Sequence, residues 1–374
     1  MKRMLPCYSK TALTLLAGLT LFLGSCKKDD DNFANDEISS TKGVYMLSEG
    51  AYGSKGSDIT YYDISAKTTQ RGYYKKVNGT DLGENATDLQ RHGSKMYCVV
   101  SGKNVGESFV DVMDAATART IKRISFNSAT AAFYPRAVAF YNNKAYVSCY
   151  DGKLRRIDTA SLSIDADTQV PAYSEGIAVA NGKIYIANSD YLFNGSNTVS
   201  VVDLATFRKV KDITVNINPV KIAAAPNGNV YVISQGDYSP KNPGNMERIN
   251  SVTDTRIPTT AVAGIDYSSV INIAGSTAYV TRSNGALPYV VNAINLTLDI
   301  VGNDNFITDG TTIKTLYGLT IDPFNKDVYV ADAINFTSTT TGIAYCFGTD
   351  GRKKFSFETS KNPQHAVFIY NYKK

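Results

Sequence analysis

Apolar and polar residues alternate along most of the chain in short runs rich in β-branched and aromatic residues, broken by Gly, Asn and Asp. One run centres on a tyrosine in "NGKIYIANSD", residues 181–190, and six similar runs occur elsewhere. The seven central tyrosines are Tyr45, Tyr97, Tyr146, Tyr185, Tyr231, Tyr279 and Tyr329. Their spacing of about 40 to 50 residues is typical of a β-propeller with about four strands per blade. The pattern therefore predicts an all-β, seven-bladed β-propeller in which these tyrosines pack between blades.

Each tyrosine run has companions that complete a blade. An apolar run precedes most copies, as at residues 136–142, and a run ending in Asp or Asn follows, as at residues 199–204. These runs are too short and too β-branched for helices. We expect strands a, b and c from them, followed by a more variable outer strand d.

The two ends of the repeat region complement each other. The region begins at "GVYMLS", a b-strand without its own a-strand, and ends with "HAVFIYN", an a-strand without its own b-strand. The N- and C-terminal strands are therefore predicted to close one blade, which removes the exposed edges of an open array. Residues 43–374 are expected to form this single propeller domain.

The first residues indicate where the chain is located. Residues 1–25 contain three basic residues and an apolar run too short to span a membrane, as in an export signal. The run ends in "LGSC", which resembles the lipobox of bacterial lipoproteins and implies cleavage before Cys26 and lipidation of its sulfur. The following "KKDDDN" is similar to the surface-export signal of lipoproteins in Bacteroides-type bacteria. We therefore expect a signal peptide at 1–25, a lipidated flexible tether at 26–42 and an outer-membrane protein facing the exterior, with the periplasmic face as the alternative.

Charge and composition narrow the possible partners. The formal net charge of +5 includes the three basic residues of the export signal, so the mature chain is only weakly basic. Nucleic acid is not indicated as a partner, and we expect membrane contact through the lipid anchor only. Cys98, Cys149 and Cys346 remain after the lipidated cysteine, and this odd number implies at least one free thiol. We interpret all three as small apolar residues within strands.

The loops that join b to c and d to the next a are expected to gather at one mouth of the central channel. Aromatic rings and fixed polar groups around one opening suit a large, partly apolar ligand that forms hydrogen bonds. For any single aromatic residue, the alternative is that it anchors its own loop. The candidate ligand-binding residues are Tyr52, Tyr134, Arg136, Tyr150, Tyr173, Glu175, Tyr191, Phe193, Tyr238, Arg282, Tyr317 and His365.

Catalytic motifs are absent from the sequence. It contains no Gly-x-Ser-x-Gly, no His-Glu-x-x-His and no glycine-rich phosphate loop after a strand. With only two histidines, a histidine-rich metal site has little to build on. His365 with Glu175 as its partner would be the one candidate acid–base pair. We expect a protein without catalytic residues, metal or cofactor, and a propeller lyase or hydrolase is kept as an alternative.

The repeats resemble the YVTN family of seven-bladed β-propellers, whose signature is similar to "AYVSC", "IYIAN", "VYVIS" and "AYVTR" here. With the lipid anchor and the aromatic loops, the chain resembles the surface cobalamin-capture lipoproteins of Bacteroides-type bacteria. That resemblance implies a corrinoid ligand at the mouth and a TonB-dependent outer-membrane transporter as the partner that receives it. No motif identifies a corrinoid, so haem, a siderophore or a glycan stay open. A protein- or glycan-interaction scaffold is a further alternative.

Overall fold

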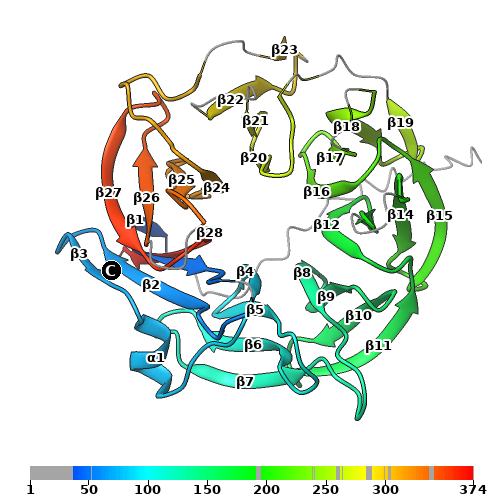
Figure 1. The fold of residues 1–374 in the computed structure, drawn as a ribbon, viewed down its shortest axis with the longest axis horizontal. Helices are drawn as coiled ribbons and strands as arrows, with labels where there is room; N and C mark the ends of the chain where they lie inside the picture. The colour runs from blue at the N-terminus through cyan, green and yellow to red at the C-terminus, as the bar shows by residue number, and fades with distance from the viewer. Residues whose placement is uncertain are drawn as a thin grey trace, which may run out of the picture.

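The computed structural model shows a ring of β-sheets (Figure 1). The structure describes residues 37–373 except positions 52, 191–194, 238, 240, 258–261, 263, 284–288, 299, 302–304 and 337–340. Within this part of the chain, the strands form seven four-stranded antiparallel sheets, and α1 (Tyr73–Asn78) is the one helix. The prediction of an all-β, seven-bladed β-propeller is therefore confirmed.

Each blade runs from an inner strand a to an outer strand d. Blade 1 combines β28 (Pro363–Tyr372), β1 (Ile38–Ser48), β2 (Asp58–Asp63) and β3 (Thr68–Gln70). Blade 2 consists of β4 (Ala86–His92), β5 (Lys95–Ser101), β6 (Ser108–Asp114) and β7 (Thr120–Ser125). Blade 3 consists of β8 (Pro135–Tyr141), β9 (Lys144–Cys149), β10 (Lys153–Asp158) and β11 (Ser163–Gln169). Blade 4 consists of β12 (Ser174–Ala180), β13 (Lys183–Asn188), β14 (Thr198–Asp203) and β15 (Arg208–Thr214). Blade 5 consists of β16 (Pro219–Ala224), β17 (Asn229–Gly236), β18 (Pro243–Asn250) and β19 (Thr255–Ile257). Blade 6 consists of β20 (Ile271–Ala274), β21 (Thr277–Arg282), β22 (Val290–Asn295) and β23 (Ile300–Val301). Blade 7 consists of β24 (Leu316–Ile321), β25 (Val328–Asp332), β26 (Gly342–Phe347) and β27 (Lys353–Thr359).

The core lies between neighbouring blades. All seven repeat tyrosines are at most 8% exposed, and each packs against strands of the next blade. Tyr185, for example, packs with Val230 and Val232 of blade 5, and Tyr329 of blade 7 packs with Val44 of blade 1. The recurring tyrosines are therefore scaffold residues, as predicted. Cys98, Cys149 and Cys346 are buried free thiols in strands, and burial raises the pKa of Cys149 to about 12.

Blade 1 is closed by the two ends of the chain. β1 pairs with β2 on one edge and with β28 on the other, with Tyr45 opposite Val367. The pairing continues to Ile38 opposite Tyr372. Residues 38–42, which the sequence assigned to the tether, therefore belong to β1. Their largely exposed, polar side chains explain the difference, because no buried apolar alternation marks this part of the strand.

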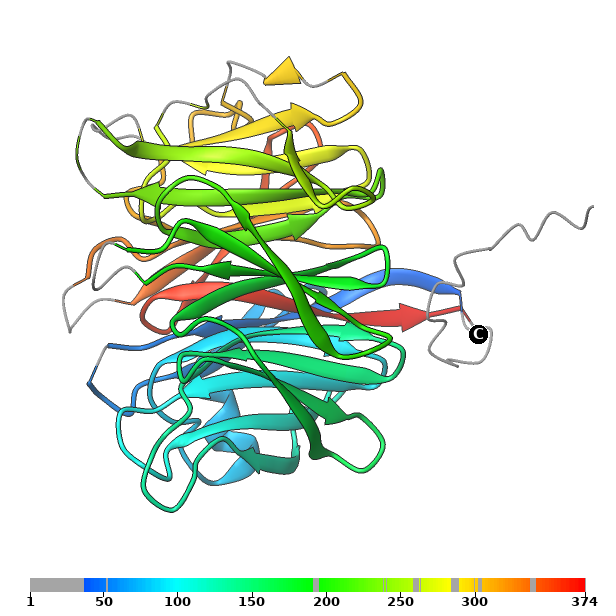
Figure 2. The same ribbon diagram turned by 90° about the vertical axis from the view of Figure 1, so that its right-hand side faces the viewer.

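The propeller has two distinct faces. In Figure 2, β1 and β28 extend from one face of the disc, where Ile38 and Tyr372 lie opposite each other. The other end of β1 leads into Glu49, which lines a cavity at the opposite face. Ile38 of β1 and Tyr372 of β28 therefore lie on the opposite side of the ring from this cavity. Cys26, the predicted signal peptide and the predicted tether up to residue 36 lie outside the described residues. Within the described residues, no helix is long and apolar enough to span a membrane.

Candidate ligand-binding mouth

The inner strands share an irregularity close to their first residues. In six blades the register with strand b shifts there, which is the mark of a β-bulge. A bulge re-aims a side chain that regular alternation would point elsewhere. The residues at these shifts all line the central cavity of about 460 Å³, and they are Thr87, Arg136, Glu175, Val220, Tyr317 and Gln364. The bulges therefore build a ring of mixed polar and apolar groups at the top of the channel.

A second cavity of about 740 Å³ lies at the mouth and shares Glu49, Arg136 and Glu175 with the channel. Its other walls come from b-to-c loops, such as residues 101–103, and from d-to-a loops, such as residues 132–134 and 172–173. The prediction that these two sets of loops meet at one mouth is confirmed for the described residues. We call this cavity the mouth cavity.

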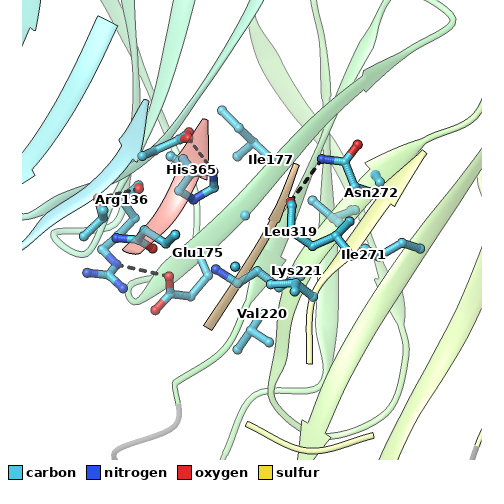
Figure 3. Close-up of a pocket in the computed structure, with 18 of the residues that line it drawn as sticks. Arg136, Glu175, Ile177, Val220, Lys221, Ile271, Asn272, Leu319 and His365 are labelled. Carbon is cyan, nitrogen blue, oxygen red and sulfur yellow. Dashed lines mark hydrogen bonds and ion pairs between the residues drawn. The ribbon is translucent and has the colours of Figure 1, made fainter. Parts of the chain in front are cut away.

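Arg136 and Glu175 form the polar centre of the mouth cavity. Arg136 Nε donates to Glu175 Oε2 at 3.1 Å, and the Tyr150 hydroxyl donates to Glu175 Oε1. The Arg136 guanidinium also lies over the Tyr150 ring, 4.9 Å from its centroid. Burial alone would lower the pKa of Arg136, but the charge of Glu175 raises it above its ordinary value. Arg136 therefore stays charged, and its hydrogen bond to Glu175 fixes the orientation of the pair (Figure 3).

Three tyrosines form the aromatic wall. The rings of Tyr150 and Tyr173 lie 5.3 Å apart between centroids, and Tyr134 is 38% exposed with its hydroxyl donating to the Lys103 carbonyl at 3.4 Å. All three line the mouth cavity together with Arg136 and Glu175. The structure thus brings together five of the residues predicted from the sequence.

Tyr134 and Tyr173 have an unusual backbone. Each lies immediately before an inner strand, with φ of 49° and 58°, in the left-handed region that bulky residues avoid. Three other blades have asparagine at this position. The carbonyl of each of these five residues accepts a hydrogen bond from a backbone N–H at the end of strand b or directly after it. These asparagines are Asn85, Asn218 and Asn362. Asparagine tolerates this conformation well, so the two tyrosines occur where another residue type suits the backbone better.

The asparagines also secure their own loops. Asn218 Nδ2 donates to the Gly236 carbonyl and Asn362 Nδ2 to the Gly50 carbonyl, both at 2.8 Å. A tyrosine cannot make this amide hydrogen bond. In blades 3 and 4, this loop-securing hydrogen bond is therefore missing, and an aromatic ring that lines the mouth cavity takes the place of the amide.

Glu49 continues the polar ring on the far side of Arg136. The Tyr317 hydroxyl donates to Glu49 Oε2, and the Tyr317 ring packs against Phe336 at 5.8 Å between centroids. Burial, together with the Glu49 carboxylate, raises the pKa of Tyr317. Tyr317 is thus a neutral hydrogen-bond donor that holds Glu49 at the entrance of the channel.

His365 lies deeper, in the wall of the channel. Its Nδ1 is 3.7 Å from Asp88 Oδ1, and Asp88 Oδ2 accepts the Val138 backbone N–H at 2.9 Å. Burial lowers the pKa of His365, Asp88 opposes that shift, and Lys221 adds to it. Glu175, the partner suggested by the sequence, is instead engaged by Arg136. Figure 3 shows His365, Lys221 and Glu175 around the same opening.

The remaining predicted residues are not at this cavity or cannot be placed. Tyr52, Tyr191, Phe193 and Tyr238 lie outside the described residues. Arg282 lines neither cavity and donates to Asn292 Oδ1 at 2.5 Å.

Sequence reasoning did not single out Glu49, Asp88 and Lys221, which line the central cavity. A signal for Glu49 exists in the repeats. Glu49 and Tyr150 both directly follow a b-strand, and both donate their backbone N–H to the left-handed residue before the inner strand of the same blade.

Comparison with known structures gives the fold alone. The similar structures include hydrazine synthase of Kuenenia stuttgartiensis, at 16% identity and TM-score 0.55 over 72% of this chain and 79% of that chain. The dihydro-heme d1 dehydrogenase NirN in complex with DHE is similar at 9% identity and TM-score 0.56 over 89% and 76%. The computationally designed Ika8 protein is similar at 13% identity and TM-score 0.54 over 88% and 92%.

No curated protein matches the chain. One family model, described as "Domain of unknown function (DUF5074)", matches residues 42–358, which is nearly the whole propeller. The YVTN-type resemblance and the likeness to cobalamin-capture lipoproteins stay predictions from the sequence. By this match, the chain belongs to the DUF5074 family.

Proposed function

We propose that this protein is a binding protein that holds a small organic ligand in the mouth cavity. The observation that carries this proposal is the placement of Tyr134 and Tyr173 in left-handed backbone positions. A bulky residue there costs about 1 to 3 kcal/mol, and such strain concentrates at functional sites. Asparagine at the same place in three other blades supports the view that the rings are kept for a ligand.

The walls of the cavity suit a ligand with a flat, partly apolar face. Tyr150 and Tyr173 offer aromatic surface, and the Arg136–Glu175 pair beside them is already oriented by its own hydrogen bonds. Pre-oriented groups bind with a smaller loss of conformational entropy. A corrinoid fits this description and is the ligand favoured by the sequence resemblance, while haem, siderophores and glycans share its chemistry in part.

The ligand is to be identified by a thermal-shift screen. The chain lacking residues 1–26 is mixed with corrinoids, haem, siderophores and glycans, and a ligand at 100 times its Kd should add about 2.7 kcal/mol of stability. No stabilisation by any of these compounds would shift the proposal toward a protein- or glycan-interaction scaffold.

The site is tested by replacing Tyr134 of blade 3 and Tyr173 of blade 4 with asparagine, the residue that three other blades have at this position. We expect the Tyr134→Asn, Tyr173→Asn double variant to melt at the same temperature as the parent or higher, because asparagine relieves the strained backbone. Ligand affinity should fall at least tenfold, by about 1.4 kcal/mol.

Asn218→Ala is the matched control for this variant. It removes the hydrogen bond to Gly236 and should lower the melting temperature without changing ligand affinity. A double variant that binds the ligand as tightly as the parent contradicts the site. A double variant that unfolds shows that the rings have a structural role instead.

We further propose that Cys26 is lipidated and anchors the protein in the outer membrane. The N-terminal strand leaves the ring at the face opposite the mouth cavity. An anchored molecule would therefore turn its mouth away from the membrane, which suits capture from the exterior. Cys26→Ala is expected to move the protein from the membrane fraction to the soluble fraction, and unchanged attachment would contradict the anchor.

Transfer of the ligand to a TonB-dependent outer-membrane transporter is the last part of this proposal. It predicts that the detergent-extracted protein carries such a transporter with it through affinity purification. The Cys26→Ala variant, which lacks the anchor, is the control for binding that depends on the shared membrane.

A further inference from the structure

Glu84 is a buried carboxylate without a partner among the described residues. It lies in the loop before β4, is 6% exposed and lines the mouth cavity. Its Oε1 accepts no hydrogen bond, and the described residues provide no ion pair for its carboxylate. Burying a charge without a partner is costly, and an unsatisfied buried polar group usually has a functional explanation. The position of Glu84 at a cavity indicates that its partner is a ligand.

The other charges at the mouth cavity do not supply that partner. Glu175 is paired with Arg136, and Asp151 is paired through both oxygens with Arg155, at 2.8 Å and 2.6 Å. Glu49 receives the neutral hydroxyl of Tyr317. Two carboxylates, Glu49 and Glu84, are therefore without a contacting cation in the described part of the chain.

The two carboxylates belong to loops that are joined directly. Ser57 links them, because its hydroxyl donates to the Glu49 carbonyl and accepts the Ala86 backbone N–H. Its own backbone N–H donates to the Gly83 carbonyl at 3.1 Å. The loop that carries Glu84 is thus held beside the loop that carries Glu49.

We infer that the ligand carries a positively charged organic group, which is a protonated amine or a quaternary ammonium. This group binds in the mouth cavity between Glu84, Glu49 and the aromatic wall. This inference rests on the proposed function. Aromatic faces attract such cations, and carboxylates beside them add Coulombic attraction. An organic cation is favoured over a metal ion because the described residues include no group of three or more side chains able to hold a metal.

The charge of Lys55 acts on Glu84, but Lys55 is paired with Glu107 at 3.0 Å. Lys103 is the other cation of the protein that could compete for Glu84. It lines the mouth cavity with an exposed side chain, and no ion pair of its ammonium is found among the described residues. If Lys103 served as the internal partner of Glu84, Lys103→Met would destabilise the fold. We expect the opposite result, with an unchanged melting temperature and tighter binding of a cationic probe because a repelling charge is removed.

The test compares two probes of the same shape. Choline carries a quaternary ammonium, and 3,3-dimethylbutan-1-ol replaces it with a neutral tert-butyl group. Binding to the full chain in non-ionic detergent is measured by isothermal titration. We expect choline to bind at least tenfold more tightly than the alcohol, and Glu84→Gln to remove this preference while leaving the alcohol unchanged. Equal affinity of the two probes, absence of choline binding, or an unchanged preference in Glu84→Gln overturns the inference.

Two controls make the result specific. Glu358→Gln removes an exposed carboxylate on β27, outside the mouth cavity, and should leave both affinities as they are. Glu84→Gln should melt within a few degrees of the parent, because none of the hydrogen bonds found in the described part of the chain involves the Glu84 carboxylate. A large fall in its melting temperature would mean that Glu84 is a structural residue and would also overturn the inference.

The outcomes separate this inference from the proposed function. If a screened ligand depends on Tyr134 and Tyr173 but not on Glu84, the mouth remains the binding site and only the charge of the ligand is wrong. A different outcome is that the Tyr134→Asn, Tyr173→Asn double variant changes no ligand's affinity while Glu84→Gln removes the preference for choline. In that case Glu84 does bind a cationic group, and the proposal that the aromatic wall binds the ligand is wrong.

Discussion

His365 lies in the channel wall among groups from two other strands, β4 and β16. Asp88 of β4 faces its Nδ1, Lys221 of β16 contributes positive charge, and the Thr87 backbone forms a hydrogen bond with it. Burial disfavours the imidazolium, so the pKa of His365 lies below its ordinary value of 6.5. The folded state therefore binds a proton on this ring less readily than the unfolded state.

The first prediction follows from the direction of that shift. Stability associated with neutral His365 is present above pH 6.5 and is lost as the pH falls through the lowered pKa of the folded state. We expect the free energy of unfolding, measured in urea, to fall between pH 7 and pH 5. His365→Gln should reduce this fall, and His92→Gln is the control. An equal fall in the parent and in His365→Gln would contradict the assignment.

Individual residues differ in how far the sequence could predict them. The seven repeat tyrosines were predictable because a buried aromatic residue within a β-branched run recurs at a regular spacing. Tyr134, Arg136, Tyr150, Tyr173 and Glu175 were predictable as a group because their loops meet at one mouth. The unpartnered state of Glu84 was not predictable, because it depends on which neighbours fail to reach a carboxylate in three dimensions.

At the scale of strands, the turns could be predicted from the sequence, whereas the bulges of the inner strands could not. Asp114, Asp158 and Asp203 each end a c-strand and accept backbone N–H groups of the following turn. Such turns are visible in the sequence, because Asp at that place is favoured for this local hydrogen bonding. The bulges of the inner strands are not visible, since a register shift depends on the partner strand. They decide which side chains reach the cavity, so the strands were predicted better than the site.

The second prediction concerns the packing of inner strands. A Cβ on Gly318 of β24 would lie 2.1 Å from the Gln364 carbonyl oxygen of β28, where the backbone has no room to move aside. We expect Gly318→Ala to lower the free energy of unfolding by about 1 to 3 kcal/mol through overpacking between blades 7 and 1. Denaturant titration measures this effect.

Gly56→Ala provides the comparison for Gly318→Ala, because the nearest atom to its added Cβ would be Ser54 Oγ at 3.4 Å. It should change stability much less. Equal stability of the two variants would show that the inner strands are not tightly packed at this point.

At the scale of the whole molecule, blade 1 is made from both ends of the chain, as the sequence predicted. The third prediction is that deletion of residues 365–374 removes most of β28 and exposes the edge of β1. The product should aggregate or lack a cooperative melting transition in size-exclusion chromatography and calorimetry. Deletion of residues 373–374 alone, beyond the end of β28, is the control. A monomeric product that melts cooperatively after the longer deletion would contradict the closure.

This closure also determines when the first strand can pair during synthesis of the chain. Ser39 donates a hydrogen bond to the Asn371 carbonyl, 332 positions later, so the inner neighbour of β1 is synthesised after all the strands of blades 2 to 7. Blades 2 to 7 can each assemble from consecutive segments as the chain grows, whereas contacts this distant in sequence form slowly. Until β28 has been synthesised, the inner edge of β1 is available to strands of other molecules. A prematurely terminated chain therefore retains a permanently open pairing edge, and its first strand can be completed only by a second molecule.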